Sequence, residues 1–251
     1  MILAQNIELS TFLRYNYVIV WLDKLEFIWV AYFIMVNNKK LKDNYKSYLL
    51  IVAFGLVMGT VTRLTDTFPY HSLWSFSSIA VDYGFWIITS TAIIYFSCSN
   101  KNAALNVFLY LSNMNFSFYI LEYIFKRYTK FYQLLLGDGD LTIVSSFNWS
   151  LLIAFDALAL LCGVTSYMLY FWNKNNKISN VLYALPICGL ITETILLLNR
   201  LYLMSINLFP LILNSVGIVA LGCLFYKKSN NKIIYMATII AGSLLGVIFI
   251  L

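Results

Sequence analysis

The sequence predicts an all-α fold, a polytopic bundle of transmembrane helices that forms a single integral membrane domain over residues 1–251. Hydrophobic residues make up 61% of the chain and charged residues only 11%, against about 45–50% and about 25% in soluble domains. Several apolar runs approach the length of about 20 residues that a helix needs to cross a bilayer. The first residues, MILAQNIELSTF, lack the basic start and cleavage site of a secretory signal, so we expect the N-terminus to be retained.

Seven apolar segments are predicted to be firm membrane spans. They cover residues 47–64, 73–97, 103–124, 147–172, 178–198, 206–226 and 233–251. An earlier segment, residues 17–36, carries Asp23, Lys24 and Glu26 in its first half, which break its apolar run. This segment is predicted to be either an eighth span or an amphipathic helix that lies in the membrane interface.

The first and the last firm spans each carry two glycines one helical turn apart. Gly55 and Gly59 lie in the stretch GLVMG, and Gly242 and Gly246 lie in GSLLG. Small residues at this spacing let two helix backbones approach closely. We therefore predict helix-packing faces at both places.

Residues 103–124 differ from the other spans in carrying two polar stripes. One consists of Asn106, Asn113 and Ser117, and the other of Asn115, Tyr119 and Glu122. Spacings of three, four and seven place the members of each stripe on one helix face. We interpret the stripes as hydrogen-bonding faces of a central helix, and a ligand-facing wall is the alternative for the second stripe.

Two proline residues fall inside the later spans, Pro186 in 178–198 and Pro210 in 206–226. Each removes a backbone hydrogen bond and is predicted to kink its helix. Transporters place such breaks near their sites, but inert membrane helices tolerate proline as well. Both interpretations stay open.

Lysine residues orient the bundle. Alternate connections hold ten of them and one acid, Asp43; the ten are Lys39, Lys40, Lys42, Lys46, Lys101, Lys174, Lys177, Lys227, Lys228 and Lys232. Because basic short loops stay cytoplasmic, we predict that these connections lie inside. The formal charge of +6 then reflects topology and attraction to anionic lipid, and nucleic acid is not an expected partner.

Ionisable residues gather toward the predicted outer side. Asp82, Asp156 and Glu193 lie within spans, and Arg63, Asp66, Glu122 and Arg200 lie at span ends. A charged side chain near the membrane centre costs about 2.5–3.5 kcal/mol on insertion scales, so such residues usually face a bundle interior or a wet cavity. We predict an outward-facing acidic vestibule that binds a cation, an amine-bearing molecule or a proton.

Internal ion pairs are the alternative explanation of the same charges. Arg63 and Asp66 are three residues apart and fit a local pair on one helix, which we favour for them. Glu193 and Arg200 are seven apart, about 10 Å along a helix axis, so a direct pair is not expected. Asp82 and Asp156 have no basic residue nearby in the sequence, and for them we favour binding or proton titration.

The sequence shows no catalytic or metal-binding pattern. Cys98, Cys162, Cys188 and Cys223 are single residues without metal-ligand spacing, so we expect buried packing residues. The stretch LLGDGDL resembles an intramembrane aspartyl protease signature, but its aspartates fall outside the spans. We expect no cofactor and no metal, and an enzyme is the less favoured interpretation.

One region resembles a family of small multi-pass membrane proteins from Gram-positive bacteria that has no assigned activity. The resemblance covers about residues 47–200 and depends on an Asp-x-Phe-Pro element at residues 66–69 and an Ala-Ala-Leu-Asn element at residues 103–106. It implies a bacterial plasma-membrane location and transfers no functional residue.

Two functions remain compatible with the sequence. One is a small transporter or permease whose acidic vestibule takes a cation or amine. The other is a binding, sensory or immunity-type module that engages an extracellular peptide, a partner membrane protein or a second copy of the chain. A polar cavity that continues to the inner face would favour transport, and a closed inner half would favour binding.

Overall fold

The computed structural model describes residues 40–66, 79, 83–127, 147–174, 177–203 and 208–250. The chain divides into two units, Met1–Lys40 and Leu41–Leu251, and the architecture below is that of the second. The predicted segment 17–36 lies outside the described residues. So does the first part of segment 73–97, up to residue 82, apart from Ile79.

Seven α-helices follow one another through the described ranges. They are α3 (Tyr45–Thr65), α4 (Tyr83–Phe96), α5 (Asn100–Arg127), α7 (Trp149–Leu169), α8 (Lys177–Leu203), α9 (Phe209–Lys228) and α10 (Lys232–Ile250), with the 3₁₀ turn η2 (Tyr170–Lys174) after α7. Each α-helix overlaps one of the seven segments predicted as spans, so the all-α prediction is confirmed for this part of the chain.

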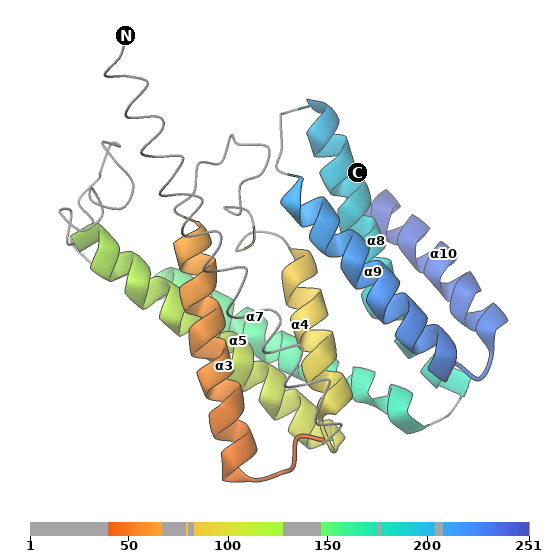
Figure 1. The fold of residues 1–251 in the computed structure, drawn as a ribbon, viewed down its shortest axis with the longest axis horizontal. Coiled ribbons are helices and arrows are strands. Elements are labelled where there is room, and N and C mark those ends of the chain that lie inside the picture. Colours follow the sequence, from red (N-terminus) through yellow and green to blue (C-terminus); the bar gives the residue numbers. More distant parts are fainter. Residues whose placement is uncertain are drawn as a thin grey trace, which may run out of the picture. The chain divides into compact units, whose positions relative to one another are not determined.

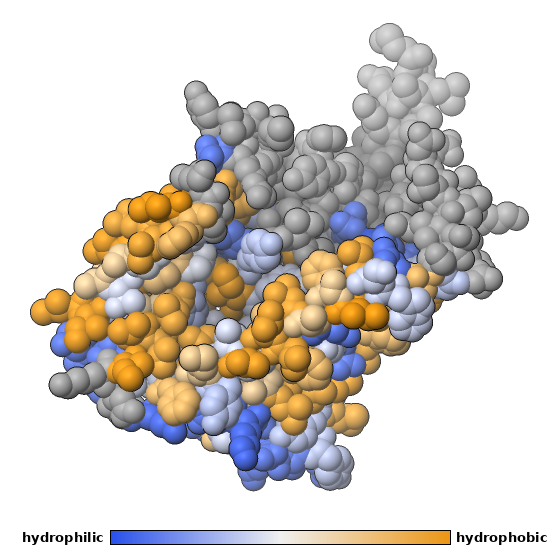
Figure 2. All heavy atoms as spheres, turned by 180° about the vertical axis from the view of Figure 1, so that it is seen from behind, coloured by the Kyte–Doolittle hydropathy of each residue, from blue (hydrophilic) through white to orange (hydrophobic). Residues whose placement is uncertain are grey.

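Five of these helices are long and apolar enough to cross a membrane: α3, α7 with η2, α8, α9 and α10. Helix α4 is apolar but has 14 residues, and α5 has 28 residues with a more polar sequence. The face in Figure 2 is largely hydrophobic, with hydrophilic residues gathered along its lower edge. This surface and these helices indicate a membrane protein.

Polar side chains cap several helix starts. Asn44 accepts a hydrogen bond from the Ser47 amide at 2.9 Å, and Asn148 accepts one from Leu151 at 3.3 Å. The Ser99 hydroxyl accepts one from the amide of Asn102 at 3.1 Å. Such caps satisfy backbone donors that a helix start leaves free, which explains why these helices begin where polar residues precede apolar ones.

The helices form two groups with α4 between them (Figure 1). In one group, α5 packs against α3 and α7; in the other, α8 packs against α9 and α10. Helix α4 contacts α5 and α7 of the first group and α8 and α9 of the second. The prediction that residues 103–124 form a central helix is therefore confirmed within the first group.

Glycines allow the closest contacts in both groups, as predicted. A Cβ atom at Gly55 would lie 2.5 Å from the backbone oxygen of Tyr110, and one at Gly59 would overlap the backbone oxygen of Met114 on α5. In the second group, a Cβ at Gly242 would lie 2.7 Å from the sulfur of Cys188 on α8. Only a residue without a side chain fits such approaches.

The two prolines have different positions. Pro186 lies inside α8, and the helix continues on both sides of it. Pro210 lies in the first turn of α9, where the missing amide hydrogen has no helical partner to lose. The predicted kink at Pro210 is therefore wrong, because α9 begins at Phe209 and not at residue 206.

Many of the basic residues gather at one end of the bundle, which we call the lysine end; it holds Lys42, Lys46, Lys101, Lys174, Lys227, Lys228 and Lys232. Hydrogen bonds tie this end together: the amide of Leu41 donates to Phe96 at 2.7 Å, and the Asn100 side chain donates to the backbone oxygen of Tyr167 at 2.8 Å. The predicted grouping of the basic connections is thus present in the fold, and their cytoplasmic location remains a prediction.

Candidate functional site

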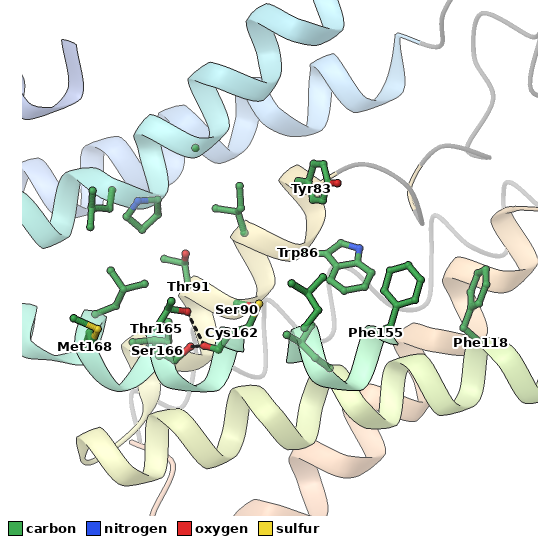
Figure 3. Close-up of a pocket in the computed structure, with 18 of the residues that line it drawn as sticks. Tyr83, Trp86, Ser90, Thr91, Phe118, Phe155, Cys162, Thr165, Ser166 and Met168 are labelled. Atoms are coloured by element: carbon green, nitrogen blue, oxygen red, sulfur yellow. Dashed lines mark hydrogen bonds between the residues drawn. The ribbon is translucent and has the colours of Figure 1, made fainter. Parts of the chain in front are cut away.

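A cavity of about 950 Å³ lies between α4, α5, α7 and α8 and reaches the end of α3. Figure 3 shows α7 on one side and α8 on the other, with Tyr83, Trp86, Ser90 and Thr91 of α4 between them. The volume is at the upper end of the range for ligand pockets, about 300–1,000 Å³. We call this cavity the groove.

One face of α7 forms a wall along the groove. Its lining residues include Leu151, Phe155, Leu158, Cys162, Thr165 and Leu169. Their spacing alternates between three and four, which places them on a single helix face. At a rise of 1.5 Å per residue, this wall is about 27 Å long, close to the thickness of a bilayer core, about 30 Å.

Charged residues lie at one end of the groove, which we call the charged mouth and which is formed by Arg63, Asp66, Tyr119 and Glu122. Arg63 is only 5% exposed and donates a hydrogen bond to the Asp66 carboxylate at 2.7 Å. The predicted Arg63–Asp66 ion pair is therefore confirmed. The guanidinium carbon also lies 5.2 Å from the centroid of the Phe118 ring, which holds Arg63 through a cation–π contact.

The remainder of the groove is mainly apolar. Ile87, Ile94, Leu111, Leu182 and Leu185 line it together with the apolar residues of α7. Two of its hydroxyl groups are engaged by the backbone, since Thr165 and Ser166 both donate to the carbonyl oxygen of Cys162, at 2.9 and 2.6 Å (Figure 3). The groove thus combines a charged end with a long apolar body.

The groove opens along its side between α7 and α8. Several of its lining residues are also exposed on the outside: Leu151 (44%), Leu158 (40%) and Met168 (60%) on α7, and Leu185 (43%) on α8. In a membrane-embedded bundle such an opening faces lipid chains and not water.

The lysine end of the same bundle is closed by aromatic packing. The Trp172 and Tyr183 rings stack with centroids 5.8 Å apart, and Phe225 lies 5.1 Å from Trp172 and 5.0 Å from Tyr183. Trp172 and Phe225 are fully buried. This cluster joins η2, α8 and α9 and fills the space between them.

Two other acids of the predicted vestibule lie elsewhere. Asp156, on α7, accepts a long hydrogen bond of 3.4 Å from Asn115 of α5, so it belongs to the α5–α7 interface. Glu193 of α8 is buried and accepts a hydrogen bond from Asn214 of α9 at 3.2 Å. The Glu193 and Asn214 side chains lie against Gly84 of α4, where a Cβ would overlap the Asn214 amide.

The predicted site residues therefore separate into three places. Arg63, Asp66, Tyr119 and Glu122 come together at the charged mouth, Asn115 lies with Asp156, and Glu193 lies with Asn214. Asp82 and the side chain of Arg200 lie outside the described residues. Over the ranges that the structure describes, no group of three metal-ligand side chains occurs.

The first polar stripe of α5 serves packing. Ser117 and Thr60 of α3 share a hydrogen bond of 2.9 Å between their hydroxyl groups, and Asn106 donates to Ser97 and Asn102 at 3.1 Å. In the second stripe, Tyr119 and Glu122 line the groove. The alternative prediction, that the second stripe forms a ligand-facing wall, therefore agrees with the structure at Tyr119 and Glu122.

Several residues of the groove and of the buried polar contacts were not predicted from the sequence. Trp86, Phe155 and Leu158 look like ordinary span residues, and only tertiary packing shows that they line the groove. Asn214 is a polar residue in an otherwise apolar run, a signal that could have located it. Of the cysteines expected in the core, Cys188 is buried, Cys162 lines the groove and Cys223 is exposed.

No protein-family model, no curated protein and no solved structure matches this chain. The family resemblance drawn from the sequence therefore remains a prediction, and the functional argument depends on the geometry of the groove.

Proposed function

We propose that this chain is a multi-pass protein of the bacterial plasma membrane that binds an amine-bearing cationic ligand at the charged mouth of the groove. The observation that carries this proposal is a cavity at one end of which the charged lining, over the residues that the structure describes, comprises two acids, Asp66 and Glu122, and one base, Arg63. Among these described residues the acids outnumber the base, so their formal charge is negative. A positively charged group is the complement of such a mouth.

The surroundings strengthen an interaction of this kind. Hydrogen bonds between an ammonium and a carboxylate are about twice as strong as neutral ones, and a low local dielectric increases the attraction further. Glu122 and Tyr119 lie one turn apart on α5 and both line the groove, so one ammonium can contact the carboxylate and the phenol ring together. Tyr119 adds an aromatic surface, which attracts cations.

Binding is favoured over transport by the packing at the lysine end. The groove becomes apolar away from the mouth, and the buried rings of Trp172, Tyr183 and Phe225 pack together at the lysine end. A polar ligand that moved inward would lose its charged partners and meet closed packing, which costs several kcal/mol for an unpaired charge. The length of the α7 wall, about 27 Å, is the observation that favours transport as the second candidate.

The test compares an amine with the matching alcohol. The full chain in lipid nanodiscs is titrated with octylamine and with octanol, and affinity is expressed per mole fraction in the bilayer so that partitioning into lipid cancels. We expect octylamine to bind about tenfold more tightly, and Glu122→Gln to remove most of that preference. The matched control is Asp43→Asn, because Asp43 is exposed and bonds to Tyr48 at the lysine end.

Equal binding of octylamine and octanol would refute the amine site, as would a preference that survives Glu122→Gln. A second measurement separates the two candidate functions. Uptake of octylamine into proteoliposomes is expected to match that of protein-free vesicles, and faster uptake that depends on Glu122 would show that the protein is a transporter.

A further inference from the structure

We propose that the ligand is a long, single-chain amphiphile that enters from the bilayer through the opening between α7 and α8 and lies with its amine at the charged mouth and its chain along the groove. This inference depends on the proposed function for the identity of the head group. It adds the chemical class of the ligand, its source and its direction in the site.

The groove is long and narrow, which favours an extended ligand. A volume of about 950 Å³ along a wall of about 27 Å gives an average cross-section of about 35 Å². A compact ligand would leave most of such a space unfilled. An extended chain matches the length of the groove and contacts apolar side chains along it.

The lining supports the same conclusion. From the mouth toward the lysine end, the groove passes Trp86 and Phe155, then Leu158 and Cys162, and then Leu169. Trp86 and Phe155 have ring centroids 6.4 Å apart. Apart from the mouth and the indole of Trp86, the described polar side chains that line this path are mainly hydroxyls: Tyr83, Ser90, Thr91, Thr165 and Ser166.

The side opening identifies the source. Six of the described lining residues are exposed: Leu151, Leu158, Thr165 and Met168 on α7 and Leu185 on α8 lie on the two helices that border the opening, and Tyr83 lies on α4. A molecule already in the bilayer reaches the groove through this opening without crossing water. A soluble amine would have to enter past Arg63 and Asp66 at the mouth.

The charges fix the direction of the ligand. Acids outnumber bases at the mouth, whereas the bases of the opposite end, such as Lys174 and Lys228, gather where the chain terminus would lie. Lys174 and Lys228 each lie 4.2 Å from an aromatic ring centroid. An ammonium is therefore attracted to the mouth and repelled from the lysine end.

The first experiment locates the chain by fluorescence quenching. Hexadecylamine carrying bromine atoms near its amine, or near its chain terminus, is added to the protein in nanodiscs, and the signal of Trp86 is isolated by subtracting that of Trp86→Phe. We expect saturable quenching at one amphiphile per protein, stronger for bromines near the amine because Trp86 lies near the mouth. Quenching that rises linearly without saturation would show lipid solvation alone, and the reverse order of bromine positions would place the head at the wrong end; either result overturns the inference.

The second experiment blocks the far half of the groove. Thr165 is exposed, lines the groove and lies about 21 Å from Leu151 along α7. Thr165→Phe is expected to weaken hexadecylamine binding about tenfold and to weaken octylamine binding much less, because the shorter chain ends before Thr165. The control is Val164→Phe, since Val164 is 57% exposed and does not line the groove.

The outcomes separate this inference from the proposed function. If Thr165→Phe leaves hexadecylamine binding unchanged while octylamine keeps its preference over octanol, the chain assignment is wrong and the amine site stands. If hexadecanol binds as tightly as hexadecylamine and both respond to Thr165→Phe, the groove takes a chain but the amine assignment is wrong, and the proposed function fails with it.

Discussion

Replacing Gly59 by alanine tests whether the contact between α3 and α5 supports both the fold and the charged mouth. A Cβ atom at this position would overlap the backbone oxygen of Met114 and lie 2.9 Å from the Cβ of Ser117. Ordinary contacts begin at 3.4 Å, so the two helices must separate by about 1 Å. A gap of that size forfeits a quarter to a half of the dispersion energy of the atoms concerned.

The net magnitude follows from two opposing terms. Overpacking of this kind costs about 1–3 kcal/mol, whereas glycine to alanine within a helix gains about 1 kcal/mol. Gly222→Ala is the matched control, because a Cβ at Gly222 meets no atom within 4 Å and the variant therefore shows the helical gain alone. We expect Gly59→Ala to be about 1–3 kcal/mol less stable than Gly222→Ala.

The assay is thermal unfolding in detergent, followed by octylamine binding in nanodiscs. Arg63 lies one turn beyond Gly59 on α3 and contacts Phe118 of α5, so separation of the helices also displaces the charged mouth. We expect weaker octylamine binding in Gly59→Ala and unchanged binding in Gly222→Ala. Equal melting temperatures for the two variants would refute the close contact and the reasoning built on it.

Three further predictions concern other parts of the fold. Asn180→Ala should lower the free energy of unfolding by about 1–3 kcal/mol, because its side-chain oxygen accepts from the Ser229 hydroxyl at 2.9 Å and from two amides of the α9–α10 turn; an unchanged melting temperature would contradict it. Asn214→Ala should cost a similar amount, since it leaves the buried carboxylate of Glu193 without this donor, and wild-type stability would mean that the pair is dispensable. In intact cells, a cysteine at the exposed residue Asn230 should resist an impermeant thiol reagent while one at exposed Trp149 reacts, and the reverse pattern would invert the predicted orientation.

The positions of the helices could be predicted from the sequence because apolar composition and polar caps are local properties of the chain. The predicted segment 47–64 corresponds to helix α3, Tyr45–Thr65, and the predicted segment 233–251 corresponds to helix α10, Lys232–Ile250. Helix α5 begins earlier than predicted, at Asn100 and not at residue 103, because Ser99 caps it. Polar residues that look like a loop in the sequence are here the first turn of a helix.

The candidate site was less predictable because it depends on which helices become neighbours. The prediction placed Asp156 and Glu193 with Glu122 in one vestibule because the three residues lie at similar depths along their spans. The depth of a residue does not determine which neighbouring helix its side chain faces. In the structure Asp156 faces α5, Glu193 faces α9 and Glu122 faces the groove. The Arg63–Asp66 pair was predictable because its three-residue spacing is a local property.

The arrangement of the groove also links ligand binding to the stability of the whole bundle. Its α7 wall belongs to the group of α3, α5 and α7, and its α8 wall belongs to the group of α8, α9 and α10. A chain that lies between Leu158 and Leu185 contacts both groups at once, so it stabilises the folded state in which they are held together. At a ligand level of a hundred times Kd this linkage amounts to about 2.7 kcal/mol. A bundle whose two groups are joined through α4 and η2 would then be most stable with the amphiphile in place, and its melting temperature should rise with hexadecylamine in the wild type but much less in Thr165→Phe.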